Sequence, residues 1–472
     1  MLLCIWTIYF LDMEMDGHTI TSSCLMFGFS LFGKNLLNIW AILFGVYLYS
    51  HYHKTHLSRY VYIGFYGTSL SPIITQIMYI SHLPYAIRLI TSLAVGLMIG
   101  FVLPPLSTHV HYSHKGYSLY NVGFSAGIIA TVVVSVLKSF GITTESRLIW
   151  SEGNNQLLFA ILCGLFAAMI IAAFLFGGKE VGESYRKILS CSGIGGTDYL
   201  RDNGGAATIL NMAVNGLFAT IFILGVGGEL NGPTIGGIFT IVGFSATGKH
   251  IRNIAPIMFG VLFASFTKRW TINSPSPMLA LLFSTTLAPI AGEFGVLMGL
   301  LAGFLHSSVA LNVGIVYGGM NLYNNGFAGG IVAIFMVPVI HSIRDRRARA
   351  KRGDFAVMHV ASEKGNMNHK KDYPAAVKLL SWLPALCVAV TIFWFSAQPA
   401  AESTEMSDTV SRLILMIGTK LGFFHGNPAQ YAELIELMSF PVRKTAHMTV
   451  NILYFDCTVR FGLRFTSPEP PT

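Results

Sequence analysis

Apolar stretches follow one another along most of the chain, with short polar connections between them. Six lie in the first part of the chain, near 1–11, 19–32, 36–50, 60–79, 86–104 and 119–138. Six more lie further on, near 207–228, 234–247, 251–266, 277–291, 294–310 and 322–340. One further stretch, 157–176, joins the two sets. So many long apolar segments predict an all-α, polytopic integral membrane protein.

The two sets of apolar stretches are copies of one another. Residues 16–50 align without a gap on residues 231–265, and 15 of the 35 paired positions are identical. The match resumes at two further pairs of segments, 65–72 with 282–289 and 118–130 with 321–333. In an apolar chain, a duplicated half of this size is typical of secondary transporters and of some channels.

The second copy is predicted to be inverted relative to the first. If all segments cross the membrane, equivalent helices are seven crossings apart, and an odd number reverses their direction. With the basic block 341–354 inside, four further basic loops also fall inside: 51–59, 109–116, 177–187 and 248–253. The loops around Arg88, 142–147 and 312–319 fall outside and carry few basic residues, with 268–269 as the exception.

Two segments in each repeat are too short for a full span. They are 19–33 with 234–248, and the Ser- and Thr-rich 67–72 with 284–289. A span needs about 20 residues, so these segments predict re-entrant or broken helices. Their ends and hydroxyls would then meet near the membrane midplane and bind a solute. The alternative is close packing of small residues between helices. If only one of the two kinds is re-entrant, the repeats are parallel.

Polar residues at corresponding places in the two copies are the candidates for a solute path. In the first repeat these are Glu14, Asp16, Thr19, Thr68, Pro72 and Asn121. In the second they are Glu229, Asn231, Thr234, Thr285, Pro289 and Asn324. We predict that part of this set converges in one polar cavity between the halves, because polar groups in hydrocarbon collect around water or solute. The converging residues are Glu229, Asn231, Thr234, Thr285 and Pro289 with Thr19, Thr68 and Pro72.

Several of these residues have alternative interpretations. A carboxylate such as Glu14 or Glu229 either lies in a proton or cation path or is simply solvated. Asn121 and Asn324, each after a tyrosine, are either helix caps or a polar selectivity element. Lys34 and Lys249 occupy equivalent places, where the sequence favours snorkelling to lipid headgroups.

Composition agrees with the membrane assignment and excludes other classes. The chain is 53% hydrophobic and 11% charged, with a mean hydropathy of +0.58. Its net charge of +9 is densest in the block 341–354, which favours a cytoplasmic membrane flank over nucleic-acid binding. The six cysteines do not have the spacing of a metal site. Nor do we favour a metal site at the histidines, because the second repeat lacks equivalents of those at 51, 53, 56, 109, 111 and 114. Without a catalytic or nucleotide-binding motif, we predict no enzyme and no cofactor.

The body of the chain, residues 1–345, resembles a bacterial family of polytopic membrane proteins, family 1576 of the domains of unknown function. The residues that carry the resemblance are GPTIGGIFTIVGFSATGK (232–249), with its echo in the first copy, and TDYLRDNGGAATILNMAVNG (197–216). The resemblance implies membrane localisation and no particular activity.

A second resemblance follows a basic linker at 346–376. Residues 375–449 resemble the VanZ-like family, which is linked to teicoplanin resistance; the matching motif residues are Ser396, Gln398, Arg443, Lys444 and His447. The last three share one helical face, which suits either anionic envelope polymer and headgroups or an interfacial anchor. Val450 and Asn451 replace the acidic residue and tyrosine of the family, so we expect this domain to be incomplete.

These observations divide the chain into a first repeat (1–141, expected to be truncated at its N-terminus), a connecting helix and loop (142–200), a second repeat (201–345), the linker (346–376) and the VanZ-like domain (377–472). We predict an inverted-repeat transporter or channel for a small solute, embedded in the lipid bilayer of the bacterial cytoplasmic membrane. The alternative is a protein of the cell envelope or of glycopeptide resistance that transports nothing. The solute, coupling ion and oligomeric state are left open.

Overall fold

The computed structural model describes residues 1–80, 84–142, 149–322 and 324–352, together with 411, 412, 415, 416, 419 and 435. Throughout this part of the chain the regular elements are helices, and seven are long and apolar enough to cross a membrane. The prediction of an all-α polytopic membrane protein is therefore confirmed. The chain divides into two units, Met1–Lys351 and Arg352–Thr472. Ser396, Gln398, Arg443, Lys444 and His447 lie outside the described residues.

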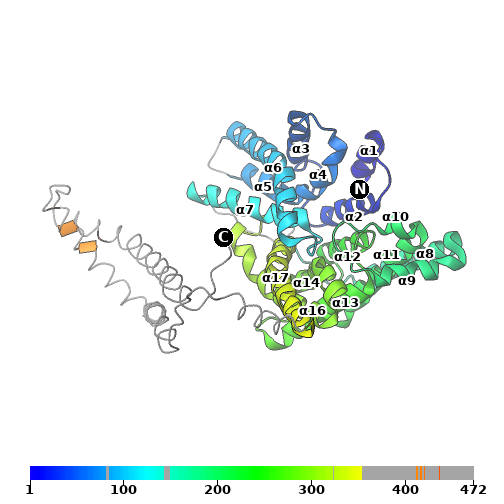
Figure 1. Ribbon diagram of the computed structural model, residues 1–472. Helices are drawn as coiled ribbons and strands as arrows, with labels where there is room; N and C mark the ends of the chain where they lie inside the picture. The colour runs from blue at the N-terminus through cyan, green and yellow to red at the C-terminus, as the bar shows by residue number, and fades with distance from the viewer. Residues whose placement is uncertain are drawn as a thin grey trace, which may run out of the picture. The chain divides into compact units, whose positions relative to one another are not determined.

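The first repeat begins with shorter helices and ends with two long ones (Figure 1). In chain order they are α1 (Leu2–Phe10), α2 (Gly17–Ser30), α3 (Trp40–Tyr52), η1 (Leu57–Arg59), α4 (Val61–Gly67), η2 (Thr68–Leu70), α5 (Ser71–Met78), α6 (Tyr85–His114) and α7 (Asn121–Ser139). The connection to the second repeat contains α8 (Asn155–Gly177), η3 (Gly178–Glu180), α9 (Val181–Ser190) and α10 (Tyr199–Asn203).

The second repeat reproduces the order of the α-helices, whereas η1 of the first repeat and η5 of the second have no counterpart. It contains α11 (Gly205–Gly225), α12 (Gly232–Phe244), α13 (Ile251–Thr267), α14 (Pro275–Phe283), η4 (Ser284–Leu287), α15 (Ala288–Phe294), α16 (Val296–Val313), η5 (Gly314–Tyr317) and α17 (Asn324–Arg352). The aligned segments pair α2 with α12 and α3 with α13, and they pair the broken helix α4–η2–α5 with α14–η4–α15. α1 has 9 residues where its counterpart α11 has 21.

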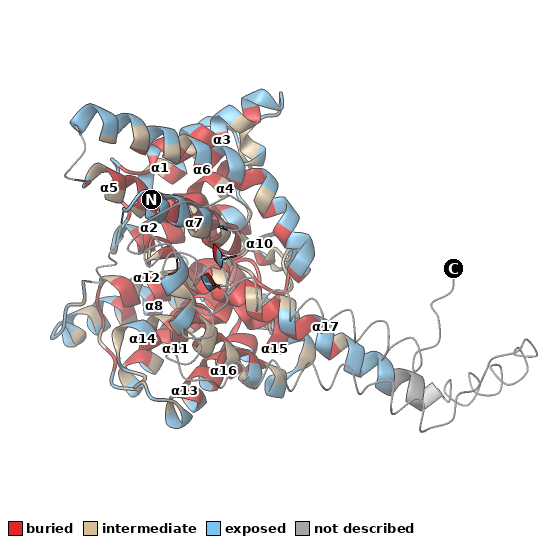
Figure 2. Ribbon diagram, turned by 90° about the vertical axis from the view of Figure 1, so that its left-hand side faces the viewer, coloured by how far each residue is buried: buried red, intermediate tan, exposed pale blue. Residues whose placement is uncertain are grey.

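The short helices α2 and α12 and the broken helices are largely buried, whereas the long helices α6 and α8 expose most of their apolar side chains. Figure 2 shows buried residues concentrated where the halves meet, with exposed residues along α3 and α6. Of the best apolar window in Pro275–Phe294, 78% is buried, against 17% for the window in Asn155–Ser190. Since α8 is also the most apolar span, its exposed side chains are suited to contact with lipid.

Equivalent helices pack in equivalent ways within each repeat. In the first, Gly100 of α6 lies against the carbonyl of Ile42 in α3. In the second, Gly303 of α16 lies against the carbonyl of Ile257 in α13. A Cβ atom at either glycine would overlap with the facing backbone. Small residues therefore allow these helices to approach closely, as they do in many membrane proteins.

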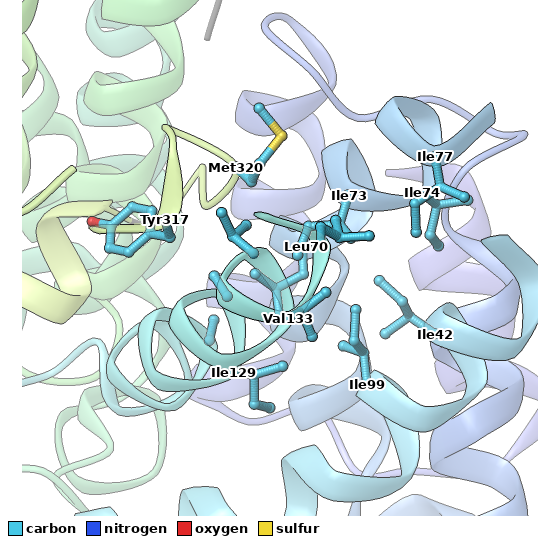
Figure 3. Close-up of a cluster of buried hydrophobic side chains, with 14 of the residues drawn as sticks. Ile42, Leu70, Ile73, Ile74, Ile77, Ile99, Ile129, Val133, Tyr317 and Met320 are labelled. Atoms are coloured by element: carbon cyan, nitrogen blue, oxygen red, sulfur yellow. The ribbon is translucent and has the colours of Figure 1, made fainter. Parts of the chain in front are cut away.

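The two repeats interlock through the connections that precede their last helices. The core of the first repeat, which includes Leu70 and Val133, is completed by Tyr317 and Met320 from the second (Figure 3). Reciprocally, Tyr117 of the first repeat belongs to a core cluster of the second. Each half thus buries part of the other, which fixes their relative position.

Candidate site at the interface between the repeats

The interface between the repeats is centred on the crossing of α2 and α12. Gly28 lies against Gly236 so closely that a Cβ on either would be 2.8–2.9 Å from the carbonyl oxygen of the other. Towards the ends, a Cβ on Gly17 would lie 2.7 Å from the Ala246 oxygen, and one on Gly232 would lie 2.6 Å from the Leu31 oxygen. The helices are therefore antiparallel, and the two end contacts exchange when the repeats are exchanged. This is a two-fold relation whose axis is perpendicular to the pair.

The same relation governs the starts of α7 and α17. Gly123 and Gly326, which are equivalent residues, lie against each other. The Leu119 amide donates to the Thr286 carbonyl at 3.0 Å, and the Leu322 amide donates to the Ser69 carbonyl at 3.2 Å. Each of these bonds is the image of the other. The segment before each last helix is therefore attached to the broken helix of the opposite repeat.

The candidates at the starts of α2 and α12 form two capping boxes. The Thr19 amide donates to Asp16 Oδ1 at 2.8 Å, and the Thr234 amide donates to Asn231 Oδ1 at 3.2 Å. In return, the threonine hydroxyls accept from the amides of the two cap residues. These residues therefore satisfy helix N-termini, and because the helices are antiparallel the two boxes lie at opposite ends of the pair, roughly 20 Å apart.

The two glutamates lie beside these caps near the surface. Glu14 is exposed and pairs with Arg201 at 3.5 Å, and Arg201 also lies 4.0 Å from Asp16. Glu229 accepts a bond from the Gly153 amide at 3.2 Å. The structure therefore does not bring the caps and glutamates of the two repeats together in one place.

The other candidates also have clear local roles. Asn121 donates to the Ser107 carbonyl at 2.9 Å, and Asn324 donates to the Ala310 carbonyl at 3.0 Å, so each ties its helix to the preceding one. Pro72 and Pro289 lie in the first turns of α5 and α15, where a missing amide costs no helical hydrogen bond. They mark helix starts after a break.

A buried lysine, Lys249, contacts the break in the second repeat. Lys249 follows α12, is fully buried, and donates from Nζ to Thr285 Oγ1 at 2.8 Å and to the Tyr120 hydroxyl at 2.5 Å. Its ammonium group lies 4.5 Å from the centre of the Tyr120 ring and 5.1 Å from that of Phe244. The prediction that Lys249 snorkels to headgroups is therefore wrong.

The equivalent lysine of the first repeat is buried in a similar position. Lys34 has an exposed fraction of 5%, and its Nζ donates to the Phe65 carbonyl at 3.2 Å. The Thr68 hydroxyl donates to that same oxygen at 2.6 Å. The prediction that Lys34 snorkels is therefore also wrong. In each repeat, the lysine that follows the short helix therefore lies close to the threonine of the broken helix.

A buried amide network holds Lys249 in place. Asn211 of α11 donates to the carbonyls of Ser245 and Lys249, at 2.7 Å each. Asn215, one turn further on, donates to Ser245 Oγ at 2.7 Å and to the Lys249 carbonyl at 3.3 Å. The backbone after α12 would otherwise leave these carbonyls without partners, so the two asparagines fix the turn that carries the lysine.

No carboxylate neutralises either lysine within the described part of the chain. The ion pairs found there involve Arg201 and Arg344. A buried ammonium group without a counter-ion is costly, because hydroxyls and aromatic rings replace only part of its hydration. The sequence signal for this site was a lysine at the same place in both copies of an otherwise apolar segment.

The histidines do not assemble into a metal site in the part of the chain that the structure describes. There, no group of three or more His, Cys, Asp or Glu side chains is placed to hold a metal ion. His114, which belongs to the second histidine cluster, is buried and its Nε2 lies 3.0 Å from Asn121 Oδ1.

Comparison with known families identifies the body of the chain. The model of the family described as "Protein of unknown function (DUF1576)" matches residues 1–139 and 178–342, well over half of the chain. The chain belongs to this family. The match confirms the resemblance of the body, and it omits the whole of α8, the helix without a counterpart in the repeats. The VanZ-like resemblance of residues 375–449 stays a prediction. Searches of curated proteins and of solved structures gave no match.

Proposed function

We propose that this member of the DUF1576 family is a membrane transport protein whose solute path follows the interface between its repeats. The observation that carries the proposal is the buried cluster of Lys249, Thr285 and Tyr120, in which a short helix and a broken helix meet between apolar spans. Polar and ionisable groups inside membrane bundles are costly and are usually kept for a solute or ion pathway. The proposal involves no covalent chemistry and no cofactor.

The antiparallel pairing of α2 and α12 supports inverted repeats. If these helices run across the membrane, a two-fold axis perpendicular to them lies in the membrane plane. Inverted repeats of this kind allow alternating access, because the two halves exchange conformations around a fixed central site. We place the protein in the bacterial cytoplasmic membrane, where the basic end of α17 marks the inside face.

A pair of equivalent surface lysine and arginine positions tests the inversion. Lys54 follows α3 and Arg269 follows α13, and both are exposed. In a chain freed of its native cysteines, we expect Lys54→Cys to be labelled from the cytoplasmic side and Arg269→Cys from the outside. The measurement is modification by a membrane-impermeant maleimide before and after permeabilisation. Labelling of both positions from one side would show a parallel duplication and would contradict alternating access through inverted repeats.

Solute flux through the full-length protein tests the function itself. Proteoliposomes carrying the whole chain are challenged with urea, tetramethylammonium and nitrate as neutral, cationic and anionic probes, and volume change is followed by light scattering. We expect at least one probe to cross well above the rate of empty liposomes. If none does, the proposal is wrong and the alternative, an envelope-associated protein that transports nothing, is favoured.

A further inference from the structure

We infer that the solute is a small monovalent anion and that Lys249, with the hydroxyls of Thr285 and Tyr120, binds it. This inference rests on the proposed transport function and names its substrate class. The first argument is charge. The interface contains two buried ammonium groups, while the carboxylates of Glu14 and Glu229 lie at its outer ends. Within the described residues no carboxylate pairs with either lysine. An anion would therefore be the counter-ion that keeps a buried ammonium group charged, whereas a cation would be repelled.

The second argument is the chemistry around Lys249. The ammonium group is held by hydroxyls rather than by a carboxylate. The Thr285 hydroxyl donates its one proton to the Leu282 carbonyl at 2.7 Å, and rotation of this hydroxyl would turn the proton towards a bound anion. A further pair of hydroxyls, Ser118 and Thr286, lies next to Thr285 with their oxygens 3.2 Å apart. All of these groups are buried. A bound anion would supply the charge-assisted hydrogen bonds that the lysine lacks.

The third argument is the continuity between the two lysines. Lys34 lies 5.3 Å from the centre of the Phe29 ring, which stacks on Phe283 at 5.9 Å. Phe283 contacts the Tyr120 ring at 6.3 Å, and Tyr120 contacts Lys249. One aromatic cluster therefore connects the two ammonium groups. Apolar walls between two single positive charges suit a small, weakly hydrated, singly charged anion better than a multiply charged one.

The decisive experiment compares nitrate flux through wild-type proteoliposomes with flux through Lys249→Met. Loss of a charged hydrogen-bonding group is worth about 1.5–3 kcal/mol, so flux should fall about tenfold to hundredfold. Lys268→Met is the matched control, because the Lys268 ammonium group also donates to hydroxyls, those of Ser307 at 3.0 Å and of Ser308. It donates to the Phe304 carbonyl as well, and all of these partners lie within the second repeat. Its nitrate flux should match that of the wild type.

Two milder variants keep the test decisive if Lys249→Met does not fold. Tyr120→Phe and Thr285→Val each remove one hydroxyl with little change in shape, and each should slow nitrate flux by about fivefold. Undiminished nitrate flux in a folded Lys249→Met protein, or in both milder variants, would overturn the inference. If urea or tetramethylammonium crosses and nitrate does not, the anion assignment fails and the transport function stands. If no probe crosses, the transport function itself fails.

Discussion

Gly303→Ala should remove most of the folded protein. A Cβ at this position of α16 would overlap with the Ile257 carbonyl of α13, and the nearest atoms are all backbone, which cannot rotate away. The helices must separate, and overpacking of this kind costs typically about 1–3 kcal/mol and occasionally more. We expect a lower melting temperature and a large loss of the monodisperse peak in detergent. The measurement is thermal unfolding followed by size-exclusion chromatography.

The equivalent and control positions sharpen this prediction. Gly100→Ala should have the same effect, because Gly100 meets the Ile42 carbonyl in the equivalent helix pair. Gly164→Ala lies on α8 with nothing within 4 Å of the added Cβ, so it should leave the melting temperature unchanged or raise it slightly. Equal tolerance of alanine at Gly303 and Gly164 would show that α13 and α16 are not held in close contact.

The class and the repeated architecture could be predicted from the sequence because they depend on local pattern. Long apolar stretches predict membrane helices from local sequence alone. The identity between the two copies predicts that they share one fold. The glycines of the two copies anticipated close approach, since only small residues let backbones meet as Gly28 and Gly236 do. The pattern could not show which helices meet, because each contact joins segments far apart in the chain.

The caps could also have been predicted from local spacing. Asp16 with Thr19, and Asn231 with Thr234, are cap residues followed three positions later by a side chain that bonds back. Their presence in both copies suggested a shared functional role. In the structure the same repetition has a simpler cause, since equivalent short helices need equivalent N-terminal partners.

The burial of Lys249 could not be predicted from neighbouring residues. A lysine after a glycine at the end of a short apolar helix is locally indistinguishable from one that reaches the headgroups. Its hydroxyl partner Tyr120 lies 129 positions earlier, in the other repeat. Only the interlocking of the two halves brings these groups together, so the centre of the proposed site is a tertiary feature.

Removal of the amide that holds this centre should be the most damaging polar substitution in the interface. Asn211→Ala takes away the donor to two buried carbonyls, those of Ser245 and Lys249. A buried group left without a partner costs about 1–3 kcal/mol. Because Asn215 still donates to the Lys249 carbonyl at 3.3 Å, we expect a loss of stability of about 1–3 kcal/mol, mainly from the Ser245 carbonyl. Nitrate flux should fall with it, because the turn that positions Lys249 loses its anchor.

The matched control is an asparagine that donates to a carbonyl at a solvent-exposed position. Asn312 is exposed and donates to the Ser308 carbonyl at 2.7 Å, one turn earlier in the same helix. Water replaces that bond when Asn312 is changed to alanine, so its melting temperature should stay close to that of the wild type. The comparison is made by thermal unfolding of the full chain, with nitrate flux measured for every variant that remains monodisperse. If Asn211→Ala is as stable and as active as Asn312→Ala, the network around Lys249 does not hold the site together. In that case, the lysine would owe its position to the aromatic rings and hydroxyls alone.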